Sequence, residues 1–528
     1  MARTICWCLL ITAFVSVVYA EDTPVALSIV VTDGKGNRIP SLTREDFQIA
    51  NGGQPAKVAA FVERHADAAI PRRILVLIDT TTITMPARAA IVSALRDLFA
   101  KSLRPGDEVL MLTAGQSLTP MSGWTSDPKE IDTALQRAST AASQTMAGDR
   151  IEAERRLREL INDIQRAGSN GAQFYSFDTL VTAIRTYAAA VYRDTRQALA
   201  LITTATDLFP SHSTRNVMII AGAGLPLRPG ADMFQYLETV KTQAEQGLLG
   251  ASLRQGAARS SPMTEASSFD LTEYFRGLSA EAWRKGIAIY AVDSEMGDSS
   301  ARLVESQRTV DRTASFATTA NASAGYELLA NETGGLAILG QRPETGLAEL
   351  RSDLDNFYTI GIVPTAAVNK DTIKVHAKNY RVRVTLGGLQ LSPDADISSR
   401  VVAHHLLKPD SNDLGISVQA MEPVADGEKR RVTLKVMIPI KRLKFVQEGS
   451  DVTGGFSVYI ATGDQLGHAS KVNKQTKQLR WPAAALQAAG DRQLTFAVDV
   501  VLEPGRNQIS VGVMDDASKA TGFDRVSI

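Results

Sequence analysis

A carboxylate and a run of hydroxyl side chains directly follow an apolar segment of this chain. Ile74–Ile78 is continuously apolar, and Asp79, Thr80–Thr82 and Thr84 come next. Carboxylate and hydroxyl oxygens are hard ligands, of the kind that Mg²⁺ binds in octahedral geometry. The same side chains can instead hydrogen-bond their own loop or cap the helix that follows. The stretch therefore predicts either a metal site or a self-bonded loop at the end of a strand.

Other residues with catalytic or ligating chemistry are sparse. Both cysteines, Cys6 and Cys8, lie inside the apolar N-terminal run. Of the six histidines only His404 and His405 are adjacent, and neighbours on a strand point to opposite faces. The sequence contains no Gly-x-Ser-x-Gly motif, no phosphate loop and no His-Glu-x-x-His motif. We therefore expect no enzyme activity, no disulfide and no thiolate metal site in the mature chain.

The N-terminus has the pattern of a secretory signal peptide. Arg3 precedes an apolar run from Ile5 to Val18, and a small residue, Ala20, ends the segment. The run is shorter than the roughly 20 residues that a membrane span needs, so we expect cleavage after Ala20 and no span afterwards. Basic and acidic residues both number 57, which gives no support for nucleic-acid binding. We expect an exported protein, periplasmic or extracellular.

The elements that would position Asp79 belong to a long α/β region, residues 71–390. Apolar strand patterns alternate with helical patterns, and this alternation predicts βαβ units and a mostly parallel, doubly wound, Rossmann-like sheet. A highly charged stretch near 149–175 is expected to be a helical insertion. The expected strands include Ile74–Ile78, Val109–Leu112, Val217–Ile220, Ile287–Asp293 and Phe357–Val363.

The two flanks have a different pattern. Residues 21–70 contain short β-rich runs separated by turns such as Asn51-Gly52-Gly53, which predicts a small β-rich lead-in module. In residues 391–528, apolar and polar positions alternate, as in Val432–Ile438 and Leu494–Val500. A period of two with intervening turns predicts an antiparallel β-sandwich.

Several short segments resemble, in order and spacing, the bacterial (acidobacterial-type) proteins with a domain related to von Willebrand factor A (VWA). The resemblance covers nearly the whole mature chain. It implies a secreted, non-catalytic protein with a VWA core and a β-rich tail, and it implies no known ligand. The segments are Val30–Gly36, Leu42–Phe47, Leu103–Val109, Thr125–Pro128, Glu332–Gly335 and Asp355–Pro364.

The metal site that such a family would carry is only partly present. Its first loop reads Asp-x-Ser-x-Ser, and here Asp79 and Thr81 match while Ile83 stands at the second serine. The usual Asp-Gly of the third loop is replaced by Ala221-Gly222. The threonine of the second loop has no clear counterpart among the helical threonines. We therefore expect a degenerate site with Asp79 and Thr81 as its remaining ligands, and no cofactor; bound Mg²⁺ is the alternative.

The resemblance and the strand pattern together suggest where a partner would bind. Ligands of open α/β sheets collect at the carboxyl ends of the strands. Asp79, Thr82 and Thr84 would border that surface together with Gly222 and Gly224. Our leading hypothesis is a non-enzymatic, adhesion-like module that binds an unknown protein partner. The alternatives are a Mg²⁺-dependent adhesin with substitute ligands and a hydrolase of envelope material.

Overall fold

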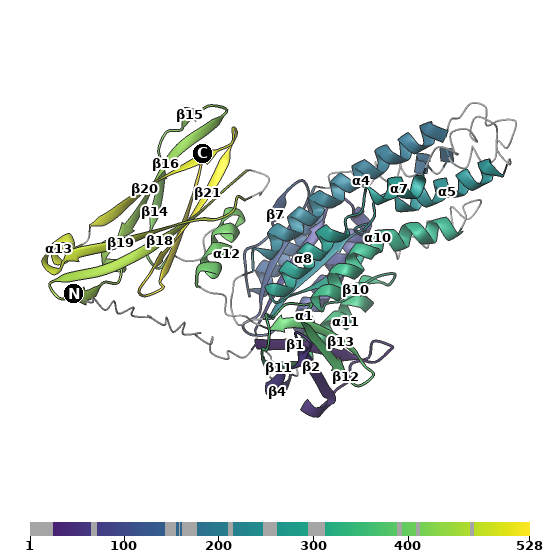
Figure 1. The fold of residues 1–528 in the computed structure, drawn as a ribbon, viewed down its shortest axis with the longest axis horizontal. Helices are drawn as coiled ribbons and strands as arrows, with labels where there is room; N and C mark the ends of the chain where they lie inside the picture. Colours follow the sequence, from purple (N-terminus) through teal and green to yellow (C-terminus); the bar gives the residue numbers. More distant parts are fainter. Residues whose placement is uncertain are drawn as a thin grey trace, which may run out of the picture.

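The computed structural model describes most of the chain and shows a mixed α/β protein with one mainly parallel sheet and several antiparallel sheets (Figure 1). The expected signal peptide and most of the expected insertion at 149–175 lie outside the described residues. The described ranges are 25–64, 71–142, 155–157, 159–160, 177–209, 215–246, 261–293, 312–387, 393–407, 412–464, 469–490 and 492–528.

The central sheet has six strands in the order β10-β9-β8-β5-β6-β7. The five strands from β10 to β6 are parallel, and β7 pairs antiparallel with β6 at the edge. Counted along the chain, this order is the 3-2-1-4-5-6 of a doubly wound sheet, and it reverses direction between β5 and β8. The strands are β5 (Arg72–Asp79), β6 (Glu108–Ala114), β7 (Leu118–Pro120), β8 (Arg215–Gly222), β9 (Ile287–Asp293) and β10 (Ala337–Ile338).

Helices cover both faces of this sheet (Figure 1). One face packs against α1 (Met85–Ser102), α2 (Pro128–Thr140) and α11 (Pro343–Asp355). The other face packs against part of α4 (Phe177–Thr206), α8 (Thr272–Arg284) and α10 (Arg312–Thr333). The first half of α4 builds a separate helical core with α5 (Ala231–Glu245) and α7 (Pro262–Ser267).

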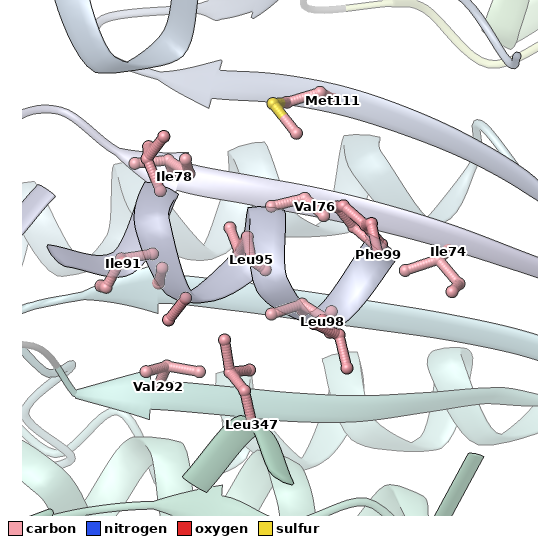
Figure 2. Close-up of a cluster of buried hydrophobic side chains, with 14 of the residues drawn as sticks. Ile74, Val76, Ile78, Ile91, Leu95, Leu98, Phe99, Met111, Val292 and Leu347 are labelled. Atoms are coloured by element: carbon pink, nitrogen blue, oxygen red, sulfur yellow. The ribbon is translucent and has the colours of Figure 1, made fainter. Parts of the chain in front are cut away.

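The continuous apolar run of β5 fits a strand that has helices packed on both faces of its sheet. Ile74, Val76 and Ile78 face α1, where they contact the core shared with Leu95 (Figure 2). The alternate residues of the strand, such as Leu75, enter the core of the opposite face. Because successive side chains of a strand point to opposite faces, both faces need apolar residues. Full burial of each such side chain contributes about 1.5–3 kcal/mol.

Strands of the lead-in residues and strands from the end of the α/β region together form two further sheets. An antiparallel sheet has the order β13-β1-β11-β4, and a smaller one has the order β12-β2-β3. The expectation that Phe357–Val363 continues the parallel sheet is wrong, since it pairs antiparallel with β1 and β4. The lead-in strands β1, β2 and β4 thus pair with strands more than 290 residues later in the chain. The strands are β1 (Val25–Thr32), β2 (Phe47–Asn51), β3 (Gln54–Pro55), β4 (Lys57–Arg64), β11 (Phe357–Val363), β12 (Ile373–Ala377) and β13 (Arg381–Gly387).

The C-terminal part contains two antiparallel sheets that share one core, in agreement with the period-two pattern. In one sheet, β16 pairs with β14 and β15 on one side and with β20 on the other. In the other sheet, the order is β17-β18-β21-β22, and β19 also pairs with β18. The elements are β14 (Ser417–Ala420), β15 (Val424–Asp426), β16 (Lys429–Pro439), β17 (Val446–Glu448), β18 (Asp451–Asp464), β19 (Asn473–Pro482), α13 (Ala483–Ala489), β20 (Gln493–Leu502), β21 (Asn507–Asp515) and β22 (Thr521–Ser527).

A helix, α12 (Pro393–Leu406), precedes these sheets and packs on β18, β21 and β22. His404 and His405 are therefore buried helical residues, and their expected position on a strand is wrong. The start of α12 is tied down by Asp394, which accepts hydrogen bonds from Tyr459 Oη at 2.5 Å and Lys474 Nζ at 2.6 Å. The hydrogen bond from Lys474, then that from Tyr459, lowers the pKa of the Asp394 carboxyl.

A buried ionic network lies at the amino end of the central sheet. Arg72 begins β5 and is 1% exposed. Its Nη2 lies 2.6 Å from Asp107 Oδ2, its backbone N–H donates to Asp107 Oδ1 at 2.9 Å, and its Nη1 donates to Asp355 Oδ1 at 3.2 Å. It also donates to the Ser102 carbonyl at the end of α1. One guanidinium thus joins a strand, a loop and the ends of two helices.

We predict that Arg72→Met destabilises the α/β region by roughly 3–5 kcal/mol, because Asp107 would remain buried without its cation. Urea unfolding followed by tryptophan fluorescence in a Trp481→Phe background would measure this change in the α/β region. The matched control is Arg96→Met, which breaks an exposed pair with Asp132. Its cost should stay within about 1 kcal/mol. Equal losses in the two variants would contradict the assignment of Arg72.

Candidate functional site

The Asp79 carboxylate, at the end of β5, is bound by its own loop. Oδ1 accepts hydrogen bonds from the Thr81 backbone N–H at 2.8 Å, the Thr81 hydroxyl at 2.7 Å and the Thr82 backbone N–H at 3.3 Å. Oδ2 accepts from the Thr82 hydroxyl at 2.6 Å. Short-range bonds of this kind are typical of Asp and Thr side chains in turns. Of the two structural roles expected for Asp79, it takes the loop-bonding one, while Thr84 is the residue that precedes α1.

The same hydroxyl connects this loop to the loop after β8. The Ala223 N–H donates to Thr82 Oγ1 at 3.2 Å, and that hydroxyl donates onward to Asp79. β5 and β8 are neighbours at the point where the strand order reverses. The hydrogen-bond relay from Ala223 through Thr82 to Asp79 therefore fixes the two loops that flank the topological switch point of the sheet.

Gly222 and Gly224 provide space for α10 above these loops. A Cβ on Gly222 would lie 2.5 Å from Tyr326 Oη and 3.2 Å from Asp79 Cβ. Gly224 has φ +89°, and a Cβ there would lie 2.5 Å from the Ala322 carbonyl oxygen. Both glycines are buried. The two glycines therefore allow α10 to pack closely on these loops. The expectation that they border an exposed contact surface is corrected, because α10 covers them.

The solvent-facing part of the site is the turn between β5 and α1. Thr81, Thr82 and Thr84 are half-buried, whereas Met85, the first residue of α1, is 53% exposed. Ile83 turns the other way and is 2% exposed in the core beneath α1. Met85 was not predicted from the sequence, where the available signal was an apolar residue directly before Pro86 at the start of a helix.

The donor set does not fit an octahedral Mg²⁺ site. Both Asp79 oxygens accept hydrogen bonds from the loop, and the hydroxyl hydrogens of Thr81 and Thr82 are directed at them. Ala221 and Ile83, which stand where the family pattern has further ligands, are apolar and buried. Asp293 at the end of β9 is buried and accepts from the Ser323 hydroxyl. Across the described ranges, no group of three or more His, Cys, Asp or Glu side chains is placed to hold a metal ion.

We predict that Thr82→Val lowers the free energy of unfolding by about 1–3 kcal/mol, because it removes a donor to Asp79 and the acceptor of the Ala223 N–H. Thr82→Ser keeps the hydroxyl and should recover most of the loss. Urea unfolding of the two variants would measure the difference. Equal stability of Thr82→Val and the unsubstituted protein would contradict the hydroxyl relay.

No helix in the described part of the chain combines the length and apolar character needed to cross a membrane.

Comparison with protein-family models gives no match, and neither does comparison with curated protein sequences. Among solved structures, an aerotolerance-related membrane protein from Bacteroides fragilis is 11% identical, with 53% of this chain and 98% of that chain covered and a TM-score of 0.22. The pilus adhesin SpaC from Lactobacillus rhamnosus GG is 8% identical, with 92% and 56% covered and a TM-score of 0.28. Three N-terminal domains of the pili tip protein Mfa5 from Porphyromonas gingivalis are 9% identical, with 96% and 78% covered and a TM-score of 0.24. These scores are too low to assign a function to this chain.

Proposed function

We propose that this chain is an exported, non-enzymatic binding protein whose α/β region is VWA-like. Its partner is a protein of the envelope or of the extracellular space. Contact occurs at the carboxyl ends of the central strands, through the turn between β5 and α1, and it needs no metal ion. The observation that carries this proposal is the closed hydrogen-bond relay from Ala223 through Thr82 to Asp79.

The position of the turn supports a binding role. Parallel doubly wound sheets bind ligands outside the carboxyl ends of their strands, where the strand order reverses. The loops after β5 and β8 meet at that place, and the relay holds them in one arrangement. A binding loop that is rigid before contact loses less conformational entropy when the partner arrives.

The chemistry of the exposed groups supports a protein as the partner. Met85 offers an apolar side chain that is 53% exposed, although its sulfur accepts a contact from the Arg88 guanidinium, and methionine is enriched in protein interfaces. Thr81 and Thr82, which precede it, are half-buried and bond their hydroxyls to Asp79, and the Thr84 hydroxyl is buried. An exposed apolar side chain beside such a hydrogen-bonded turn is the kind of group that forms the centre of an interface. The turn presents no cysteine or histidine, and its one carboxylate, Asp79, is engaged by the loop, which favours binding over catalysis.

We predict that Met85→Asp reduces capture of the native partner at least about tenfold, since it would place a charge in the apolar centre of the contact. The assay is quantitative pull-down from the native envelope with the mature chain as bait. Met263→Asp is the matched control, because Met263 on α7 is 51% exposed and lies outside the turn. Equal capture by the two variants would reject the turn as the contact.

We predict that EDTA leaves this capture unchanged and that calorimetric titration with Mg²⁺ or Mn²⁺ gives no binding heat. The physical reason is that the Asp79 oxygens already accept hydrogen bonds from the loop. Saturable heat that disappears in Asp79→Ala, together with loss of capture in EDTA, would instead establish the metal-dependent adhesin.

A further inference from the structure

Among the described residues, the edge of the C-terminal sandwich at β20 has no neighbouring strand. β20 pairs with β16 along its length, from Leu502 opposite Arg430 to Gln493 opposite Pro439. No strand of the described residues pairs with its other side, and none of the described backbone hydrogen bonds reaches it from there. A row of backbone N–H and C=O groups on one side of a ten-residue strand is therefore open to another chain.

The common devices that protect such an edge are missing from β20. The strand contains no lysine and no proline, and its single charged residue, Asp499, accepts a hydrogen bond from Thr433 on the outer face. Its inward side chains Leu494, Phe496 and Val500 are only half-buried, although they contact the shared core. The open edge thus leaves apolar core side chains partly in solvent.

The position of β19 in the opposite sheet shows where a further strand beside β20 would lie. Phe496 of β20 packs edge-on against Phe456 of β18, with ring centroids 5.7 Å apart, so these two strands face each other across the core. The neighbour of β18 on this side is β19, and Lys477 of β19 lies directly opposite Phe456 in the ladder. Residues directly opposite in an antiparallel pair share a face. Lys477 therefore lies on the core-facing side of β19.

The core-facing side of β19 is buried at Leu479, but in the described structure its part from Asn473 to Lys477 is not. Lys477 and Asn473 are exposed, and Gln475 is half-buried, although all three share the face of the buried Phe456, Val458 and Ile460. Within the described chain no carboxylate pairs with Lys477. A strand added beside β20 would face this part of β19 at the usual spacing between packed sheets, about 10 Å. Figure 1 shows α12 on the other side of the sandwich from β20, where it does not obstruct this edge.

We propose that the β20 edge binds an extended segment of a partner protein by strand addition. Main-chain hydrogen bonds to β20 would provide affinity, and alternate side chains would provide specificity. The segment carries apolar residues at every second position, to cover Leu494, Val498 and Val500. It carries one acidic residue beside Phe496, where its carboxylate would meet Lys477 across the core. This surface is separate from the turn at Met85, and the proposal does not depend on the binding role proposed for that turn.

The test uses the full mature chain and a labelled nine-residue peptide that mimics such a segment. The peptide has valine at alternate positions, threonine between them and one glutamate in place of the valine beside Phe496. A control peptide carries lysine in place of the glutamate. Fluorescence anisotropy should show binding of the glutamate peptide and about tenfold weaker binding of the lysine peptide, because like charges would meet at Lys477.

Variants of the protein test whether Lys477 is the residue that recognises the charge of the peptide. Lys477→Glu should reverse the preference between the two peptides. Lys374→Glu, which changes an exposed lysine on the strand β12, should leave the preference unchanged. Hydrogen exchange should show that the glutamate peptide protects β20 amides, which a contact through side chains alone would not do.

Several results would overturn the proposal. These are equal binding of the two peptides, binding of neither, or binding without protection of β20. Sedimentation that reveals a concentration-dependent dimer with β20 already protected would also overturn it, since a second copy of the chain would then occupy the edge.

Discussion

The structure depends first on the burial of Arg72 at the amino end of β5. A buried guanidinium is tolerated only when its hydrogen bonds and its charge are matched. Here Asp107 and Asp355 supply two carboxylates, and the Ser102 carbonyl accepts a further bond. These partners come from α1, from the loop before β6 and from α11. The Arg72 side chain thus connects β5 to the ends of two helices and to the loop before β6.

A second pair involves β13, the strand that pairs with the lead-in strand β1. Asp353 on α11 accepts from Tyr290 Oη of β9 at 3.3 Å and pairs with Arg383 of β13 at 2.6 Å. Burial, and next the charge of Asp353, raise the pKa of Tyr290 to about 12, so the phenol stays protonated and remains a donor at neutral pH. Buried, charge-matched ion pairs thus lie on the side of the sheet where Arg72 begins β5, whereas the loop after β5 at the carboxyl end includes the exposed Met85.

At the carboxyl end of the sheet, some contacts of the site join residues that are close in sequence, and others join the site to the distant helix α10. Asp79, Thr81 and Thr82 are close in sequence, and their hydrogen bonds could be anticipated from the residue types. The cover that α10 places over Gly222 and Gly224 could not be anticipated. A glycine pair after a strand is compatible with an exposed loop and with close helix packing, and only the position of Ala322 and Tyr326 decides between them.

The sequence by itself determined the elements whose signals are periodic. The two-sided burial of β5, the alternation of β16 and β20 and the absence of an intact metal motif were all visible in residue order, because periodicity and ligand identity are local properties. The tertiary structure alone decided which distant segments pair. Phe357–Val363 looks like another parallel strand, yet it lies between β1 and β4. His404 and His405 lie on a helix, and β20 is left at an open edge. Strand pairing is set by contacts between residues hundreds of positions apart, and a strand's own sequence does not encode its neighbour.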